Sequence, residues 1–162
     1  MPELTAQGNA FTELVLEVFR LHGLILRDGD AIARPVGLTS ARWQILGVVE
    51  HGAIPVASVA RLMGLSRQSV QRTADALERE GFTEYAENVR HLRAKLVDVT
   101  EKGREALRFV AERQAEWANE IGGKHELEDL QTALRVLREL RESLEPQSTK
   151  AKAGRKNMEV KE

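Results

Sequence analysis

The sequence predicts a mainly α-helical fold with a small β-wing, namely a winged helix-turn-helix flanked by N-terminal and C-terminal dimerisation helices. Residues 57–80 hold two short helix patterns around a glycine turn, and residues 82–99 hold two strand patterns around a basic loop. Apolar helix patterns stand at both ends. The expected segments are a dimerisation helix and connector (1–36), the winged helix-turn-helix (37–108), dimerisation helices (109–146) and a disordered tail (147–162).

The composition is typical of a cytoplasmic globular protein. The 162 residues suffice for a buried core, and 42% of them are hydrophobic. Cysteine is absent, which excludes disulfides, zinc–thiolate sites and thiol-based redox sensing. The N-terminus has no cationic stretch before an apolar run, and no apolar run approaches the length of a membrane span. We therefore expect a cytoplasmic protein without a membrane contact.

The net charge of −1 does not by itself favour nucleic acid. The charge is unevenly distributed, because residues 55–108 hold 10 basic and 8 acidic side chains, or +2. Residues 1–54 carry −2 and residues 109–162 carry −1. Any binding of DNA would depend on where these charges point.

Residues 9–27 have the apolar spacing of a first helix, and Gly29 and Pro35 are expected to end it. The helix is apolar on most of its faces, so it needs burial on more than one side. At the end of a chain, this predicts packing against a second subunit. The residues expected at the interface between two copies are Phe11, Val15, Val18, Phe19, Trp117, Leu130, Leu134 and Leu137.

A second helix is capped by Thr39 or Ser40 and runs to about Val49, and Gly52 ends it. Residues 54–56 are too short for a free-standing strand, but they could pair beside the wing.

Two short helices around Gly64 form the expected helix-turn-helix. Ala60 is small enough for the helices to cross closely, Gly64 tolerates a positive φ, and Val70 packs into the shared core. Ser66 can cap the second helix, which is expected to end at Gly81.

The second helix of the helix-turn-helix, which Ser66 caps, is polar and basic on its outward side near its N-terminus. Arginine can bind two acceptors of guanine, glutamine can read adenine, and a helix N-terminus favours phosphate. A solvated helix face is the alternative, and the adjoining turn and wing favour DNA. The candidate contacts are Ser66, Arg67, Gln68, Ser69, Gln71 and Arg72.

The expected wing consists of strands at residues 82–87 and 94–99 with a short basic loop between them. Such a hairpin can enter the minor groove, where negative potential concentrates. A surface hairpin that arginine keeps soluble is the alternative. The candidate contacts in the loop are Arg90, His91 and Arg93.

Two helices are expected after the wing. Thr100 begins the first, Gly122 and Gly123 break it, and residues 126–144 form the second, which Pro146 stops.

The chain resembles the MarR (multiple-antibiotic-resistance regulator) family of bacterial winged-helix regulators, closely over residues 38–107. The residues that carry the resemblance are Leu38, Thr39, Trp43, Leu46, Val59, Ala60, 64–68, 77–82, the wing and 99–104. The resemblance implies a homodimer whose lobes reach adjacent major grooves of a near-palindromic site in double-stranded DNA. It also implies a small aromatic or phenolic effector that weakens DNA binding.

The resemblance places a ligand pocket at His22, Arg42 and Trp43. Trp43 could stack on an aromatic ring, and Arg42 could pair with a carboxylate. The simpler alternative is a core tryptophan and an interface histidine. One departure concerns the wing, where the family usually has an aspartate two residues before its arginine. His91 stands there, so Arg93 is held by another group or is more mobile, or His91 adds a pH-sensitive cation beside phosphate.

We therefore expect a sequence-specific DNA-binding transcriptional regulator, a dimeric repressor that a small ligand releases. No phosphate-binding loop, nucleophile elbow or metal-binding helix motif is present, and the four histidines lack the spacing of metal ligands. We expect no enzyme activity, no metal and no cofactor. The alternative, which the near-neutral charge favours, is a winged-helix protein-interaction module without DNA binding.

Overall fold

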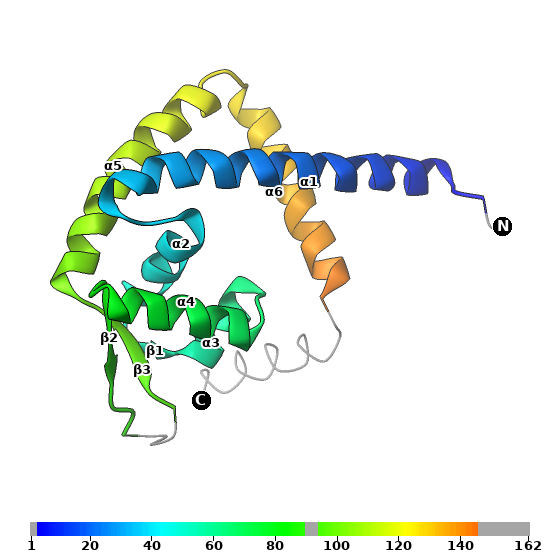
Figure 1. Ribbon diagram of the computed structural model, residues 1–162. Coiled ribbons are helices and arrows are strands. Elements are labelled where there is room, and N and C mark those ends of the chain that lie inside the picture. Colours follow the sequence, from blue (N-terminus) through cyan, green and yellow to red (C-terminus); the bar gives the residue numbers. More distant parts are fainter. Residues whose placement is uncertain (1–2, 90–93, 146–162) are drawn as a thin grey trace, which may run out of the picture. The chain divides into compact units, whose positions relative to one another are not determined.

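The computed structural model describes residues 3–89 and 94–145 and is mostly helical with one small sheet. It forms two compact units, which divide between Ala115 and Glu116. The elements, in chain order (Figure 1), are α1 (Ala6–Ala33), the 3-10 helix η1 (Arg34–Val36), α2 (Ser40–Val49), β1 (Ile54–Pro55), α3 (Val56–Met63), α4 (Arg67–Arg79), β2 (Thr83–Ala86), β3 (Leu96–Val99), α5 (Glu101–Gly122) and α6 (Leu127–Leu144). The predicted fold class is confirmed. The predicted disordered tail, residues 147–162, lies outside the described residues.

Helix α1 is longer than its sequence pattern predicted, because Gly29 does not end it. Gly29 is buried, and a Cβ atom there would collide with the hydroxyl of Ser40 at the start of α2. That hydroxyl donates to the carbonyl of Leu26 (3.0 Å), and the Ser40 N–H donates to the Asp30 carboxylate (2.7 Å). The glycine thus lets α1 and α2 approach closely, and the helix ends only at Ala33, before Pro35.

The sheet has the order β1-β3-β2, and all its pairs are antiparallel. Ile54 pairs with Val97, so the short third strand that the sequence suggested is present. Val97 and Val99 lie on the same face of β3. This face points into the core, and both side chains are buried. The Thr39 hydroxyl caps α2 by accepting from the Arg42 N–H (3.4 Å).

The helix-turn-helix consists of α3, a turn and α4. Gly64 has φ 65°, and the Leu65 N–H donates to the Ala60 carbonyl (3.0 Å), which closes the end of α3. Ala60 and Val70 are both buried, as predicted. The buried face of α4 consists of Val70, Ala74 and Leu77.

The start of α5 is fastened to the end of α4. The Thr100 hydroxyl donates to the carbonyls of Gly81 (2.7 Å) and Phe82 (3.1 Å) and accepts from the Gly103 N–H (3.1 Å). Lys102 donates to the Glu80 carbonyl (2.6 Å) and lies 4.3 Å from the centre of the Phe82 ring. Thr100 and Lys102 thus join the start of α5 to the backbone at the end of α4.

The second unit contains the end of α5 and helix α6. None of the α6 residues is buried, although Leu130, Leu134 and Leu137 lie at helical spacing. Among residues 3–89 and 94–145, no helix has both the length and the apolar character needed to cross a membrane.

We predict that Gly103→Ala destabilises the fold by about 1–3 kcal/mol, because overpacking of a close contact forces the backbone to move. A Cβ atom at Gly103 would collide with the Phe82 carbonyl and approach a Val99 methyl group to 2.7 Å. Urea denaturation followed by circular dichroism measures the change. The matched control is Gly47→Ala in α2, where a Cβ atom meets nothing within 4 Å. This control should be neutral or stabilise by up to about 1 kcal/mol. Equal effects of the two substitutions would contradict the prediction.

Candidate nucleic-acid interface

The N-terminal end of α4 presents polar and basic side chains to solvent. Ser66 caps the helix, since its hydroxyl accepts from the Ser69 N–H (3.1 Å). Arg67, Gln68 and Arg72 are exposed and form no ion pair or hydrogen bond through their side chains within the described residues. The structure thus brings these predicted contacts together on one helix, with their charges available to an outside partner.

Gln71 differs from these residues because it is half-buried and held by two neighbours. Its amide nitrogen donates to the Asp75 carboxylate (2.8 Å) and to the Tyr85 hydroxyl (2.8 Å), and Tyr85 donates to the same Asp75 oxygen (2.6 Å). We call Gln71, Asp75 and Tyr85 the polar triangle. It joins helix α4 to strand β2 of the wing.

Hydrogen bonds and burial in the polar triangle determine the protonation states of Asp75 and Tyr85. The hydrogen bond from Tyr85, followed by that from Gln71, lowers the pKa of Asp75 below the usual 3.8. Burial and the adjacent carboxylate raise the pKa of Tyr85 well above its ordinary value. At neutral pH the aspartate is therefore charged and the tyrosine is protonated.

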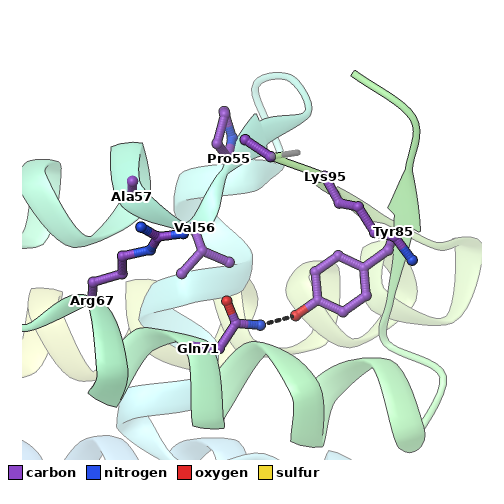
Figure 2. A pocket seen from close by; sticks show the side chains of 8 residues that line it. Pro55, Val56, Ala57, Arg67, Gln71, Tyr85 and Lys95 are labelled. Carbon is purple, nitrogen blue, oxygen red and sulfur yellow. Dashed lines mark hydrogen bonds between the residues drawn. The ribbon is translucent and has the colours of Figure 1, made fainter. Parts of the chain in front are cut away.

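A hollow of about 290 Å³ lies beside the polar triangle, between α3, α4 and the wing. Figure 2 shows the amide nitrogen of Gln71 turned toward the Tyr85 hydroxyl and the amide oxygen turned away from it. Two cations, Arg67 and Lys95, contribute to the lining. The residues that line the hollow are Pro55, Val56, Ala57, Arg67, Gln71, Tyr85, Ala94 and Lys95.

The wing is described only up to its tip. The Asn88 amide donates to the Ala94 carbonyl (3.0 Å) and so ties together the two sides of the loop. The predicted contacts Arg90, His91 and Arg93 lie outside the described residues.

The residues predicted for a ligand pocket stand in three different environments. His22 is exposed on α1, and Trp43 is half-buried and packs against the core. Arg42 forms a two-pronged ion pair with Glu80 at the end of α4, with both N···O distances 2.9 Å. None of the three lines the hollow. Within the described residues, no group of three His, Asp or Glu side chains could hold a metal ion.

The sequence prediction did not include Asp75, Tyr85 or Lys95 among the site residues. Asp75 follows Gln71 by four residues, so their neighbourhood on one helix face was available from the sequence. Tyr85 belongs to a different element, and its strand pattern gave no sign that its hydroxyl points toward α4.

Comparisons with known proteins agree with this geometry. The model of the MarR family matches residues 36–94. An uncharacterised protein of Mycobacterium tuberculosis is 41% identical over 106 residues, which cover 65% of this chain and 74% of that protein. The crystal structure of Sco5413, a MarR family transcriptional regulator from Streptomyces coelicolor, matches with a TM-score of 0.72 and 25% identity, over 83% of this chain and 94% of that one. The M. tuberculosis transcriptional regulator MOSR, solved in complex with DNA, matches with a TM-score of 0.68 and 20% identity, over 82% and 98% of the two chains.

We predict that Arg42 and Glu80 are energetically coupled by about 0.5–1 kcal/mol, since their paired geometry is partly shielded from water. Their side chains are 27% and 39% exposed. A double-mutant cycle with Arg42→Ala and Glu80→Ala, followed by urea denaturation, measures the coupling. The control cycle uses Lys124 and Glu120, which form a single contact (3.0 Å) and are 59% and 72% exposed. A coupling no larger than that of the control would show that the Arg42–Glu80 pair adds nothing in solution.

Proposed function

The chain belongs to the MarR family of transcriptional regulators, and from this premise we propose that it is a cytoplasmic homodimer that represses transcription by binding a near-palindromic DNA site. A small aromatic or phenolic effector would release it. The observation that carries the proposal is the exposed N-terminal end of α4. There, Arg67 and Arg72 have no side-chain partner among residues 3–89 and 94–145, and they stand beside a wing.

The shape and charge of α4 support contact with the major groove. Its buried apolar residues face the core, and the exposed side chains of Arg67, Gln68 and Arg72 have no partner within the described residues. Arg67 and Arg72 can donate to guanine or to phosphate, and Gln68 can read adenine. The Ser66 and Ser69 hydroxyls and the helix N-terminus favour an adjacent phosphate. The wing contacts that we propose, Arg90, His91 and Arg93, would reach the flanking minor groove.

A second subunit is supported by the apolar side chains that the single chain exposes. On α1, Phe11, Val18 and Phe19 are exposed, and Val15 is half-buried. Exposed apolar groups at this density typically mark an interface. The proposed dimer interface further includes Trp117, Leu130, Leu134 and Leu137. Two copies held at a fixed spacing would read two half-sites of a near-palindrome.

The proposed effector response rests on the family, with His22, Arg42 and Trp43 as the candidate pocket. Because Glu80 already engages Arg42, a carboxylate-bearing effector would compete with that ion pair. Such competition would loosen the contact between α2 and the end of α4. Titration of the protein–DNA complex with benzoate and salicylate, followed by fluorescence anisotropy, examines this part of the proposal.

We predict that Arg67→Ala and Arg72→Ala each weaken binding to the preferred DNA site by about 1–3 kcal/mol, because each removes a charged donor. The preferred site is first selected from genomic fragments, and binding is then measured by anisotropy at several salt concentrations. Loss of a base contact relaxes the preference at one position of the DNA site. Loss of a phosphate contact weakens binding to all sequences alike and lowers the dependence of binding on salt concentration. The control is Arg108→Ala on α5, which removes an exposed arginine that pairs with Glu101. Wild-type protein without any sequence preference would refute the proposed function.

We predict that Phe19→Glu weakens dimerisation at least about tenfold, because it places a charge in the proposed apolar interface. Sedimentation velocity over a range of micromolar concentrations measures the monomer fraction. Leu62→Glu is the matched control, since Phe19 and Leu62 are 67% and 68% exposed and only Phe19 lies in the proposed interface. A monomeric wild type, or equal behaviour of the two variants, would contradict the proposed dimer.

A further inference from the structure

The hollow beside the polar triangle brings together two cations from different elements. Arg67 stands at the start of α4 and Lys95 directly before β3, and Figure 2 shows them on opposite sides of the hollow. None of the eight residues that line the hollow is acidic. Both cations are exposed, and neither pairs with a carboxylate among residues 3–89 and 94–145. Two positive charges that share one space without a counterion favour the entry of an anion.

Tyr85 links the two elements that carry these cations. Its hydroxyl donates to Asp75 on α4 (2.6 Å), and the Lys95 ammonium lies 5.9 Å from the centre of its ring. This distance is within the roughly 6 Å over which a cation is attracted to an aromatic ring. The lysine of the wing thus rests on a ring that is tied to α4, so the two sides of the hollow are joined before any anion enters.

The location of the hollow matches the path that a DNA strand would take. The proposed function puts α4 in the major groove and the wing in the flanking minor groove. A sugar–phosphate backbone separates these two grooves, so it must pass between α4 and the wing. The hollow lies there, between α3, α4 and the wing. Its volume of about 290 Å³ is just below the roughly 300–1,000 Å³ of most small-molecule sites, and it suits a group as small as a phosphate.

We propose that the hollow binds one phosphate of the DNA backbone, which Arg67 and Lys95 hold from opposite sides. This inference rests on the proposed DNA-binding function and deepens it. It assigns Arg67 to a phosphate rather than to a base, and it adds Lys95 to the residues that contact DNA. A phosphate contact of this kind fixes the register of α4 on the duplex and carries no base preference of its own.

Replacement of single phosphates by methylphosphonate tests the proposal, because it removes one charge from the DNA and leaves every base in place. Duplexes of the preferred site, each with one methylphosphonate, are titrated by anisotropy against the full-length wild type, Arg67→Ala, Lys95→Ala and the double variant. We expect one position at which the wild type binds about tenfold more weakly, as for the loss of a charged hydrogen bond. At that same position each single variant should lose about threefold and the double variant less than about twofold.

Two arginines that do not line the hollow provide the controls. Arg72 lies on α4, and Arg108 lies on α5 and pairs with Glu101. Arg72→Ala and Arg108→Ala should both keep the full loss at that methylphosphonate position, although Arg72→Ala binds every duplex more weakly. Arg67 and Lys95 are exposed, so their variants should melt like the wild type. Lys95→Gln repeats the test if Lys95→Ala does not.

Inorganic phosphate is a second source of the same chemistry. Titrations of unmodified DNA in sodium chloride and in sodium phosphate at equal ionic strength separate the two sources, because general screening is then the same. We expect the two wild-type dissociation constants to agree within about twofold. A larger loss of affinity in phosphate, which Arg67→Ala and Lys95→Ala abolish, would assign the hollow to the free ion and overturn the inference.

Two results of the methylphosphonate series would overturn the inference while the proposed function stands. In the first, Arg67→Ala and Lys95→Ala change the response at different positions or at none. In the second, Arg67→Ala relaxes the preference for one base pair and leaves the response at every phosphate unchanged, as expected of a base contact. Wild type without sequence preference would end both proposals together.

Discussion

The contact between the start of α5 and the end of α4 fixes the geometry of the whole DNA-binding lobe. Thr100 binds the backbone at Gly81 and Phe82, and Gly103 leaves room for the Phe82 carbonyl. Strand β3 runs directly into this junction, so the same few residues set where α4 ends and where the wing returns. A side chain at Gly103 would move all three elements, because the close contact is with backbone rather than with a flexible side chain.

The positions of the charged residues matter more in this protein than its net charge. The chain is nearly neutral, and even helix α4 carries the anion Asp75. One oxygen of the Asp75 carboxylate accepts from both Tyr85 and Gln71, the other members of the polar triangle. Arg67 and Arg72 have unpaired donors within the part of the chain that the structure describes. An anion on a DNA-binding face is thus compatible with the proposed function when its role is to orient a neighbour.

The winged-helix lobe and the apolar helices α1 and α6 would have different roles in the proposed recognition of DNA. In the proposed function, a single lobe would present one helix to the groove, which would limit the number of base contacts it could make. In a lone chain, α1 and α6 expose large apolar residues to water, which is unfavourable. Pairing of two copies would bury them and double the length of DNA that is read, so one feature of the sequence would serve both stability and specificity.

The sequence determined the elements and the family, because hydrophobic periodicity, caps and turn glycines act over a few residues. The helix-turn-helix and the buried roles of Ala60 and Val70 follow from such local rules. The tertiary structure decided which distant groups meet. The sequence pattern predicts that Gly29 ends a helix, but Gly29 is the point of contact with Ser40. Arg42 pairs with the carboxylate of Glu80, which is 38 residues away in the sequence. The Gln71 amide nitrogen meets Asp75 and Tyr85 for the same physical reason. Periodicity assigns a side chain to a face of its helix, and the packing decides which partner it meets there.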